Sequence, residues 1–223
     1  MMTIDWAGER LALLPERAVW WERERTLFIA DPHFGKASAF RHAGIPVPET
    51  AHDADLARLD TVLDATAARR LVILGDFLHA RTGRTEATLI ALAVWRERRA
   101  ELEIVLVLGN HDRRAGRPPA EWRIECVAEP WRLFPFLCCH EPQEFSGSFV
   151  LAGHLHPSFH LRERRGKGLS SPCFHFAPRV AVLPAFGSFT GTHRMPVMRG
   201  DRIFLVGSEE VLDVSPLAAR SAH

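Results

Sequence analysis

The sequence predicts an α/β (α+β) fold, in which strands and helices alternate in the first half of the chain and strands dominate the second half. Apolar runs typical of buried strands occupy residues 26–31, 70–76, 103–112 and 148–156, and each ends in polar residues. Two segments, 50–68 and 85–99, carry apolar side chains at helical spacing. Gly and Pro residues divide the rest into short strands. This order of elements predicts helices packed on sheet layers.

The elements expected along the chain begin with a hairpin over about residues 10–30, which leads into a polar loop. Two helices should then cover the sheet. Their buried faces are predicted from residues at helical spacing, namely Leu56, Leu59, Val62 and Leu63 in the first helix and Leu89, Leu92, Ala93 and Trp95 in the second. The chain should end in strands within residues 202–214.

Length and composition predict one domain, 1–223, because α/β chains of this size commonly form a single core. No run of about 18 apolar residues occurs, and the first residues lack the pattern of a signal peptide, so we expect a cytoplasmic protein without a membrane partner. The four cysteines show no CxxC spacing, which favours buried thiols over a zinc knuckle or disulfides.

Four polar clusters follow the strand-like runs and predict a metal site. If the strands are parallel and belong to one sheet, their carboxyl ends bring the clusters to one edge. In extended backbone, residues i and i+2 point the same way, so each His-containing pair can bind from one face. The candidate ligands are Asp31, His33, Asp76, Asn110, His140, His154 and His156.

The ligand types constrain the metal. Mixed nitrogen and oxygen ligands favour Mn2+, Fe or Zn2+ over Mg2+ and Ca2+, which prefer oxygen shells. Asp76 has two carboxylate oxygens and can bridge two cations. Because Asp31 and Asp76 are the only charged candidates, two divalent ions would keep excess positive charge, and the substrate should be anionic.

The motifs DPH, GDFLH, GNHD, a His before EP and GHLH, in this order over residues 26–157, resemble the calcineurin-like metallophosphoesterase superfamily. Three further segments, GKASAFRHAGIPVP (35–48), GHLHPS (153–158) and LPAFGSFTG (183–191), resemble its bacterial DNA-ligase-associated branch. The chain departs from this pattern at Pro32 and Phe34, where related sequences often carry leucines. Neither residue is a candidate ligand.

The resemblance implies a two-sheet β-sandwich flanked by helices. It also implies that Asp31, His33, Asp76 and His156 hold one metal and that Asp76, Asn110, His140 and His154 hold the other. His111 would be the catalytic acid that protonates the leaving oxygen or steadies the phosphoryl charge. Two bridged ions would activate a shared water for in-line attack on phosphate.

Several residues near the motifs have two interpretations. His79 follows Asp76 by three residues and either supports the ligands and substrate or has no role in the site. Asp112 either orients His111 or caps a helix. Ser188 and Thr190 either donate to phosphate or serve a turn.

The formal net charge of +1 gives little support for nucleic-acid binding through the overall charge of the protein. Lys36 and Arg41 follow the first ligand pair and are expected to contact phosphate. Three local basic clusters either contact substrate or are solvated surface: Arg96, Arg98 and Arg99, then Arg113, Arg114 and Arg117, and finally Arg162, Arg164, Arg165 and Lys167. The second and third follow ligand motifs and can flank the metals, and Arg113 and Arg114 are expected to contact DNA together with Lys36 and Arg41.

Three functions are compatible with these residues. The first, suggested by the branch resemblance, is a Mn2+-dependent DNA endonuclease in DNA repair, acting on single-stranded DNA in association with a DNA ligase and a helicase. The second is a phosphodiesterase or phosphatase for small nucleotides or phosphoproteins. The third is a scaffold without activity, against which the complete ligand set argues.

Overall fold

The computed structural model describes all residues except 46, 48–50, 162–168 and 220–223. Its first sheet contains seven strands. β1 to β4 pair antiparallel in sequence order, and β4 to β7 pair parallel. The strands are β1 (Met2–Trp6), β2 (Glu9–Leu14), β3 (Ala18–Trp21), β4 (Thr26–Ile29), β5 (Arg70–Leu74), β6 (Glu103–Val107) and β7 (Glu125–Val127). The predicted opening hairpin is therefore part of a four-stranded meander that starts at β1.

The second sheet has nine strands among the described residues, and its centre is the parallel trio β9, β10 and β13. Two further strands lie outside the consecutive strand order of this sheet: β15 pairs with β12, and β16 pairs with β15. That order is β14 (His193–Arg194), β11 (Pro157–Leu161), β12 (Leu169–Phe176), β13 (Val180–Val182), β10 (Phe149–Ala152), β9 (Phe136–Cys138) and β8 (Trp131–Leu133), with β15 (Arg202–Val206) and β16 (Val211–Asp213).

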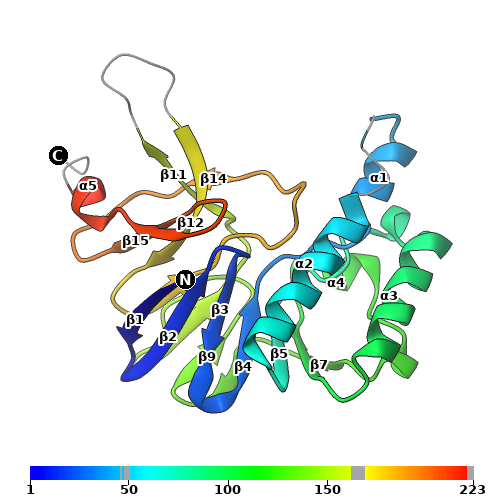
Figure 1. The fold of residues 1–223 in the computed structure, drawn as a ribbon, viewed down its shortest axis with the longest axis horizontal. Coiled ribbons are helices and arrows are strands. Elements are labelled where there is room, and N and C mark those ends of the chain that lie inside the picture. The colour runs from blue at the N-terminus through cyan, green and yellow to red at the C-terminus, as the bar shows by residue number, and fades with distance from the viewer. Residues whose placement is uncertain (46, 48–50, 162–168, 220–223) are drawn as a thin grey trace.

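Helices α2 (Ala51–Thr66) and α3 (Glu86–Arg98) confirm the two predicted helices and cover one face of the first sheet (Figure 1). Thr85 caps α3 by accepting the Thr88 N–H at 3.2 Å. The other helices are short: α1 (Lys36–His42), α4 (Asn110–Ala115), α5 (Ser215–Ala219) and the 3-10 turns η1 (Glu22–Glu24), η2 (Arg81–Gly83) and η3 (Ala120–Trp122). None of the helices in the described part of the chain has the length and apolar character needed to span a bilayer.

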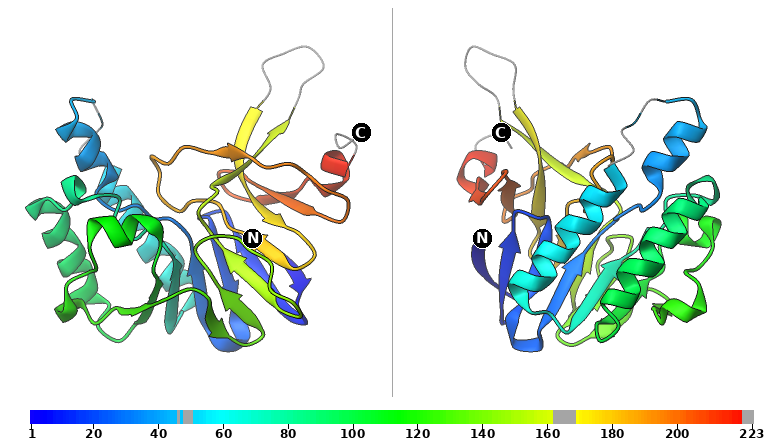
Figure 2. Two further views of the ribbon diagram at one scale, coloured as in Figure 1. Left: turned by 180° about the vertical axis from the view of Figure 1, so that it is seen from behind. Right: turned by 45° about the vertical axis from the view of Figure 1, so that its right-hand side comes forward.

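Successive side chains of the central strands in the first sheet point to opposite faces, and the two faces contribute to two hydrophobic cores. Leu27 and Ile29 of β4 pack with α2 and α3, whereas Phe28 packs with the second sheet, whose Phe136 and Phe174 lie in the same cluster. Full burial of each such side chain contributes roughly 1.5–3 kcal/mol. The two sheets therefore form a sandwich with the helices outside the first sheet, as predicted (Figure 2).

The prediction that one sheet edge carries all four polar clusters is wrong. The strands before Asp31, Asp76 and Asn110 belong to the first sheet, but the run before His154 is β10 in the second sheet. The two sheets meet at this end, where a bridge joins Ala30 to Ala185. An apolar run buried on both faces has the same pattern in either sheet, so the sequence does not distinguish them.

Candidate metal centre

Five of the seven candidate ligands have a left-handed backbone conformation at or just after the strand ends. The φ angles are 50° at Asp31, 46° at His33, 52° at Asp76, 69° at His154 and 47° at His156. The expectation that extended backbone aligns residues i and i+2 is therefore wrong for both pairs. Left-handed non-glycine residues are uncommon and cost on the order of 1–3 kcal/mol, and they concentrate at functional sites. Here they turn the side chains inward from both sheets.

Two glycines allow the loops to approach one another. A Cβ at Gly75, whose φ is 84°, would collide with the His140 ring, and a Cβ at Gly109 would collide with the Asp76 carboxylate. The glycines of GDFLH and GNHD are thus required by close approach of the ligand side chains.

The first cluster contains Asp31, His33 and His156, whose ligand atoms lie within 4.8 Å of one another. Nε2 of His33 is 3.4 Å from Nε2 of His156. Asp31 is fully buried, and its Oδ2 accepts the His154 N–H at 2.8 Å. Its Oδ1 has no hydrogen-bond partner within the part of the chain that the structure describes. A buried carboxylate oxygen without a donor favours a cation beside it.

The second cluster contains Asp76, His140 and His154, again with ligand atoms within 4.8 Å. His140 Nε2 lies 3.0 Å from His154 Nδ1 and 2.8 Å from Oδ1 of Asn110, the first residue of α4. The structure therefore brings together all seven predicted ligand residues in two adjoining groups.

Hydrogen bonds to main-chain carbonyls determine which nitrogens of the His140 and His156 rings can bind a metal. His140 Nδ1–H donates to Leu74 O at 3.1 Å, and His156 Nδ1–H donates to Gly191 O at 3.0 Å. Because a carbonyl only accepts, the Nε2 atom of each neutral ring carries a lone pair directed into the site. Burial lowers the pKa of His33 and favours its neutral form, whereas at His156 burial is outweighed by Asp31, which raises the pKa of that imidazole.

The spacing of these atoms fits shared cations. Two ligands of one metal at about 2.1 Å lie roughly 3.0–3.4 Å apart at octahedral or tetrahedral angles. The nitrogen pairs of His140 with His154 and of His33 with His156 have this separation, at 3.0 and 3.4 Å. The donor set thus fits two divalent ions.

Asp76 lies between the clusters. Its Oδ1 is 3.4 Å from His140 Nε2, and its Oδ2 is 3.8 Å from His33 Nε2. Burial raises the pKa of Asp76, and a neighbouring positive charge would favour its ionised form. This position matches a residue shared by two metals.

His111 lies at the open side of the site, with its side chain 32% exposed. Its Nδ1–H donates to His79 O at 2.5 Å, and its Nε2 is 3.9 Å from Asp76 Oδ2. The His79 ring stacks on His111 with centroids 5.1 Å apart, and its Nδ1 lies 3.4 Å from His33 Nδ1. Burial lowers the pKa of His79 to about 4, with the Lys36 charge adding to the effect. Of its two interpretations, the supporting one agrees with these contacts.

The contacts of Asp112 favour the cap interpretation and extend it. Its carboxylate accepts Gly109 N–H at 2.9 Å at the start of α4, and it also accepts Asp76 N–H at 2.8 Å and Phe77 N–H at 2.9 Å. Burial raises the pKa of Asp112 to about 6. Asp112 therefore fastens the GDFLH loop to the GNHD loop.

The four residues predicted to contact substrate differ in their burial and in their hydrogen-bond or ion-pair partners. Lys36 begins α1 and is half-buried, and burial lowers its pKa against the opposing effect of Asp76 and Asp31. Arg41 donates to Ser38 Oγ at 3.1 Å. Arg113 pairs with Glu129 at 3.2 Å, and Arg114 is exposed.

Other basic clusters have a structural role or lie outside the described residues. Arg96 is buried and donates to Trp122 O at 2.7 Å. Arg99 pairs with Asp60 and Asp64 at 2.7 and 2.6 Å. The cluster Arg162, Arg164, Arg165 and Lys167 falls within residues 162–168, which the structure does not describe.

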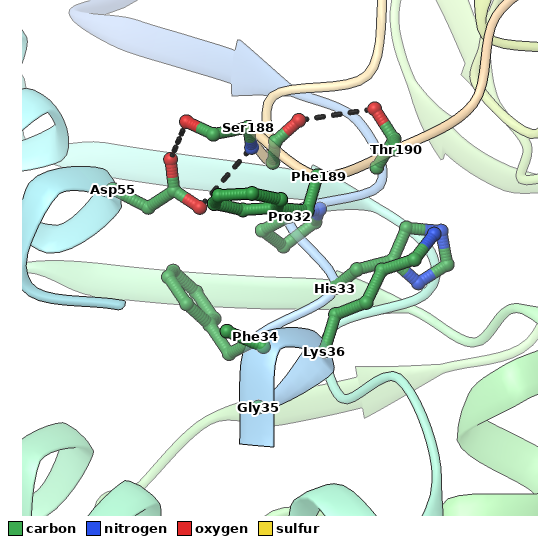
Figure 3. A pocket seen from close by; sticks show the side chains of 11 residues that line it. Pro32, His33, Phe34, Gly35, Lys36, Asp55, Ser188, Phe189 and Thr190 are labelled. Atoms are coloured by element: carbon green, nitrogen blue, oxygen red, sulfur yellow. Dashed lines mark hydrogen bonds between the residues drawn. The ribbon is translucent and has the colours of Figure 1, made fainter. Parts of the chain in front are cut away.

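The sequence did not single out Phe189, which lines a pocket beside His33 and Lys36 (Figure 3). Its neighbour Thr190 shows the turn contact considered above, since its Oγ1–H donates to Gly187 O at 3.0 Å. The Ser188 Oγ–H instead donates to Asp55 of α2 at 2.5 Å. The sequence signal for Phe189 was an aromatic side chain set among Gly, Ser and Thr in a turn.

Comparison with known proteins agrees with this geometry. A family model of the Calcineurin-like phosphoesterase matches residues 24–172. The crystal structure of the Pseudomonas putida nuclease MPE has 44% sequence identity and a TM-score of 0.84, covering 95% of this chain and 99% of that one. A weaker similarity, with 15% identity and a TM-score of 0.42, links the chain to YfcE, a phosphoesterase from E. coli, over 85% of this chain and 98% of that one.

None of the curated proteins compared with the sequence matches it. The family match covers more than half of the chain and includes the DPH, GDFLH, GNHD and GHLH motifs. The chain is a metal-dependent phosphoesterase and belongs to the calcineurin-like phosphoesterase family.

Proposed function

We propose that this protein is a DNA endonuclease that hydrolyses phosphodiester bonds with two divalent ions. The observation that carries the proposal is the placement of Asp76 between two clusters of lone-pair donors, at 3.4 Å from His140 and 3.8 Å from His33. The 44% identity to a protein described as a nuclease supports nucleic acid as the substrate.

Asp31, His33, Asp76 and His156 would hold one ion, and Asp76, Asn110, His140 and His154 the other. The mixture of imidazole and oxygen ligands favours Mn2+, with Fe or Zn2+ as alternatives. Two such ions would lower the pKa of a water, orient the phosphate and neutralise its charge.

His111 would supply the proton for the leaving oxygen. Its Nδ1–H is occupied by the His79 carbonyl, so the transferable proton is on Nε2, which faces Asp76 at 3.9 Å. His79 would hold the His111 ring by this bond and by stacking, and Asp112 would hold the loops that carry Asp76 and Asn110.

Lys36, Arg41, Arg113 and Arg114 would form a basic rim that binds the DNA backbone. A local rim is needed because the whole chain has a net charge of only +1. We further propose single-stranded DNA as the preferred form, and repair in association with a DNA ligase and a helicase as the setting.

The near-neutral charge also favours a second candidate, hydrolysis of small phosphodiesters or monoesters, since these need no extended basic surface. The same ligand set would serve either substrate class.

Incubation of Mn2+-loaded protein with circular single-stranded DNA, circular duplex DNA and methyl p-nitrophenyl phosphate tests the proposal. A circle has no ends, so its linearisation requires an endonuclease. We expect linearisation of the single-stranded circle by the wild type and none by Asp76→Asn. Hydrolysis of the small ester with an intact circle at low salt would replace the endonuclease by the second candidate.

A further inference from the structure

A carboxylate outside the two clusters binds the main chain of a candidate ligand. Glu129 lies in the connection from β7 of the first sheet to β8 of the second. Its Oε2 accepts the His140 N–H at 2.8 Å and the Glu141 N–H at 3.0 Å. The Glu129 side chain is only 14% exposed, so water competes little for these bonds. None of the motifs that predicted the metal site contains this residue.

The position of the His140 main chain decides where its ring nitrogen points. His140 is fully buried, its carbonyl accepts Gly153 N–H at 3.1 Å, and its Nδ1–H donates to Leu74 O at 3.1 Å. Nε2 then lies 2.8 Å from Asn110 Oδ1 and 3.0 Å from His154 Nδ1. A shift of the main chain at His140 would therefore move Nε2 away from the other ligands of its cluster.

Glu129 provides an acceptor that the strand ladder does not. Beyond the end of β9, Cys139 N–H still donates to Leu151 O of β10 at 2.9 Å, but the next amide, that of His140, donates to the Glu129 side chain. Within the part of the chain that the structure describes, this amide has no main-chain acceptor. A largely buried N–H that loses its acceptor costs free energy, so the segment would shift to restore a partner.

The Arg113 ion pair is the weaker contact of Glu129. It joins Oε1 to Arg113 at 3.2 Å, and the Arg113 side chain is 58% exposed, so solvent screens the pair. The two amide bonds to Oε2 are shorter and charge-assisted, and bonds of that kind are stronger than neutral ones. Glu129 therefore acts mainly through His140 and not through Arg113.

We propose that Glu129 is a positioning residue for the second of the two ions, whose expected ligands are Asp76, Asn110, His140 and His154. It holds the His140 main chain so that Nε2 is directed at this ion. Among the described residues it makes no hydrogen bond or ion pair with His33 or His156, so binding of the first ion should not change. The inference rests on the proposed two-ion site and not on the choice of DNA as substrate.

Titration of the metal-free protein with Mn2+, followed by calorimetry, tests the proposal. In Glu129→Ala the second ion should bind about 10- to 100-fold more weakly, the usual effect of removing a group that orients a ligand, and the first ion should keep its wild-type Kd. Glu129→Gln keeps an acceptor oxygen at the same reach and should restore most of the affinity. Glu129→Asp keeps the charge but is one methylene shorter, and it should not.

Two further variants separate positioning from general destabilisation. Adding Glu129→Ala to His140→Ala should weaken metal binding no further than His140→Ala alone, because Glu129 acts through that ligand. Glu9→Ala is the matched control, since Glu9 is another buried carboxylate, which accepts Trp21 Nε1–H at 2.8 Å in the first sheet. It should leave both Kd values unchanged even where it lowers the Tm.

A wild-type Kd for the second ion in Glu129→Ala, equal weakening of both ions, or tighter binding by Glu129→Asp than by Glu129→Gln would overturn the positioning role. The last comparison decides the matter if Glu129→Ala does not fold. A wild-type protein that binds only one Mn2+ would instead overturn the two-ion site. Two bound ions without cleavage of DNA would overturn the nuclease function alone.

Discussion

His111 donates its Nδ1 proton to the main-chain carbonyl of His79 at 2.5 Å, and the two rings stack with centroids 5.1 Å apart. This bond fixes the ring orientation and leaves Nε2 directed toward Asp76. A neutral His111 can only accept at Nε2, whereas a protonated one can donate there. Proton donation to a leaving oxygen therefore requires the imidazolium form.

His111→Ala should slow cleavage of DNA and of alkyl phosphodiesters by on the order of 10²- to 10⁴-fold, the usual size of acid catalysis. Nitrophenyl esters should lose much less, because their leaving group needs little protonation. Metal content measured by elemental analysis should remain at the wild-type value. Equal losses on alkyl and nitrophenyl esters would assign His111 to charge stabilisation or binding.

Asp76→Asn should abolish activity and lower the bound metal below that of any variant lacking a single histidine. Asparagine keeps an oxygen for the His111 N–H, which Asp76 Oδ1 accepts at 2.9 Å, but removes the charge that both ions would share. His154→Ala is the comparison, since it removes a ligand expected for one ion only. Two metals still bound to Asp76→Asn would contradict the bridging role.

Gly109→Ala should lower activity and metal content, because the added methyl collides with the Asp76 carboxylate at an ordinary φ of −86°. Gly191→Ala is a matched control: its Cβ would meet nothing within 4 Å among the described residues, and its carbonyl remains able to accept from His156. Metal binding by titration separates the two. The prediction fails if the two alanine variants bind metal equally.

Removal of metal should destabilise the fold, because ions that bind the clustered ligands of the folded chain, and not the dispersed ligands of the unfolded chain, stabilise the folded state. At an ion concentration 1,000 times Kd, binding to the folded state adds about 4 kcal/mol, or roughly 10 °C in Tm for a chain of this length. Thermal denaturation with EDTA should show this loss. Mn2+ should restore the Tm, and Ca2+, which prefers oxygen ligands, should restore little. An unchanged Tm on chelation would argue against two buried ions.

Replacement of Arg113 and Arg114 together by alanine should weaken cleavage of single-stranded DNA and reduce the slope of log K against log salt by about 1.4, at about 0.7 for each phosphate that is no longer neutralised. Arg69→Ala with Arg98→Ala is the control of equal charge, because both residues line a pocket at the opposite end of β5 from Asp76. Hydrolysis of methyl p-nitrophenyl phosphate should change little in either. Identical salt slopes in the two double variants would remove Arg113 and Arg114 from the rim.

Much of the candidate site was predictable because its chemistry belongs to side chains in short motifs. The ligand types, their order and the ends of the strands that precede them are all visible in DPH, GDFLH, GNHD and GHLH. The helices α2 and α3 were predictable for a similar reason, since their apolar spacing is local. The one-domain assignment and the roles of individual ligands stay predictions.

The sequence by itself determined which residue types can hold two cations, the elements that precede them and the family to which they belong. Only the tertiary structure decided that β10 lies in the second sheet, that left-handed turns orient the ligands, and that the carbonyls of Leu74, His79 and Gly191 select the ring nitrogens. The physical reason is that every residue carries a carbonyl, and a buried strand has the same apolar pattern in either sheet. Which carbonyl meets which imidazole depends on packing between segments far apart in the chain.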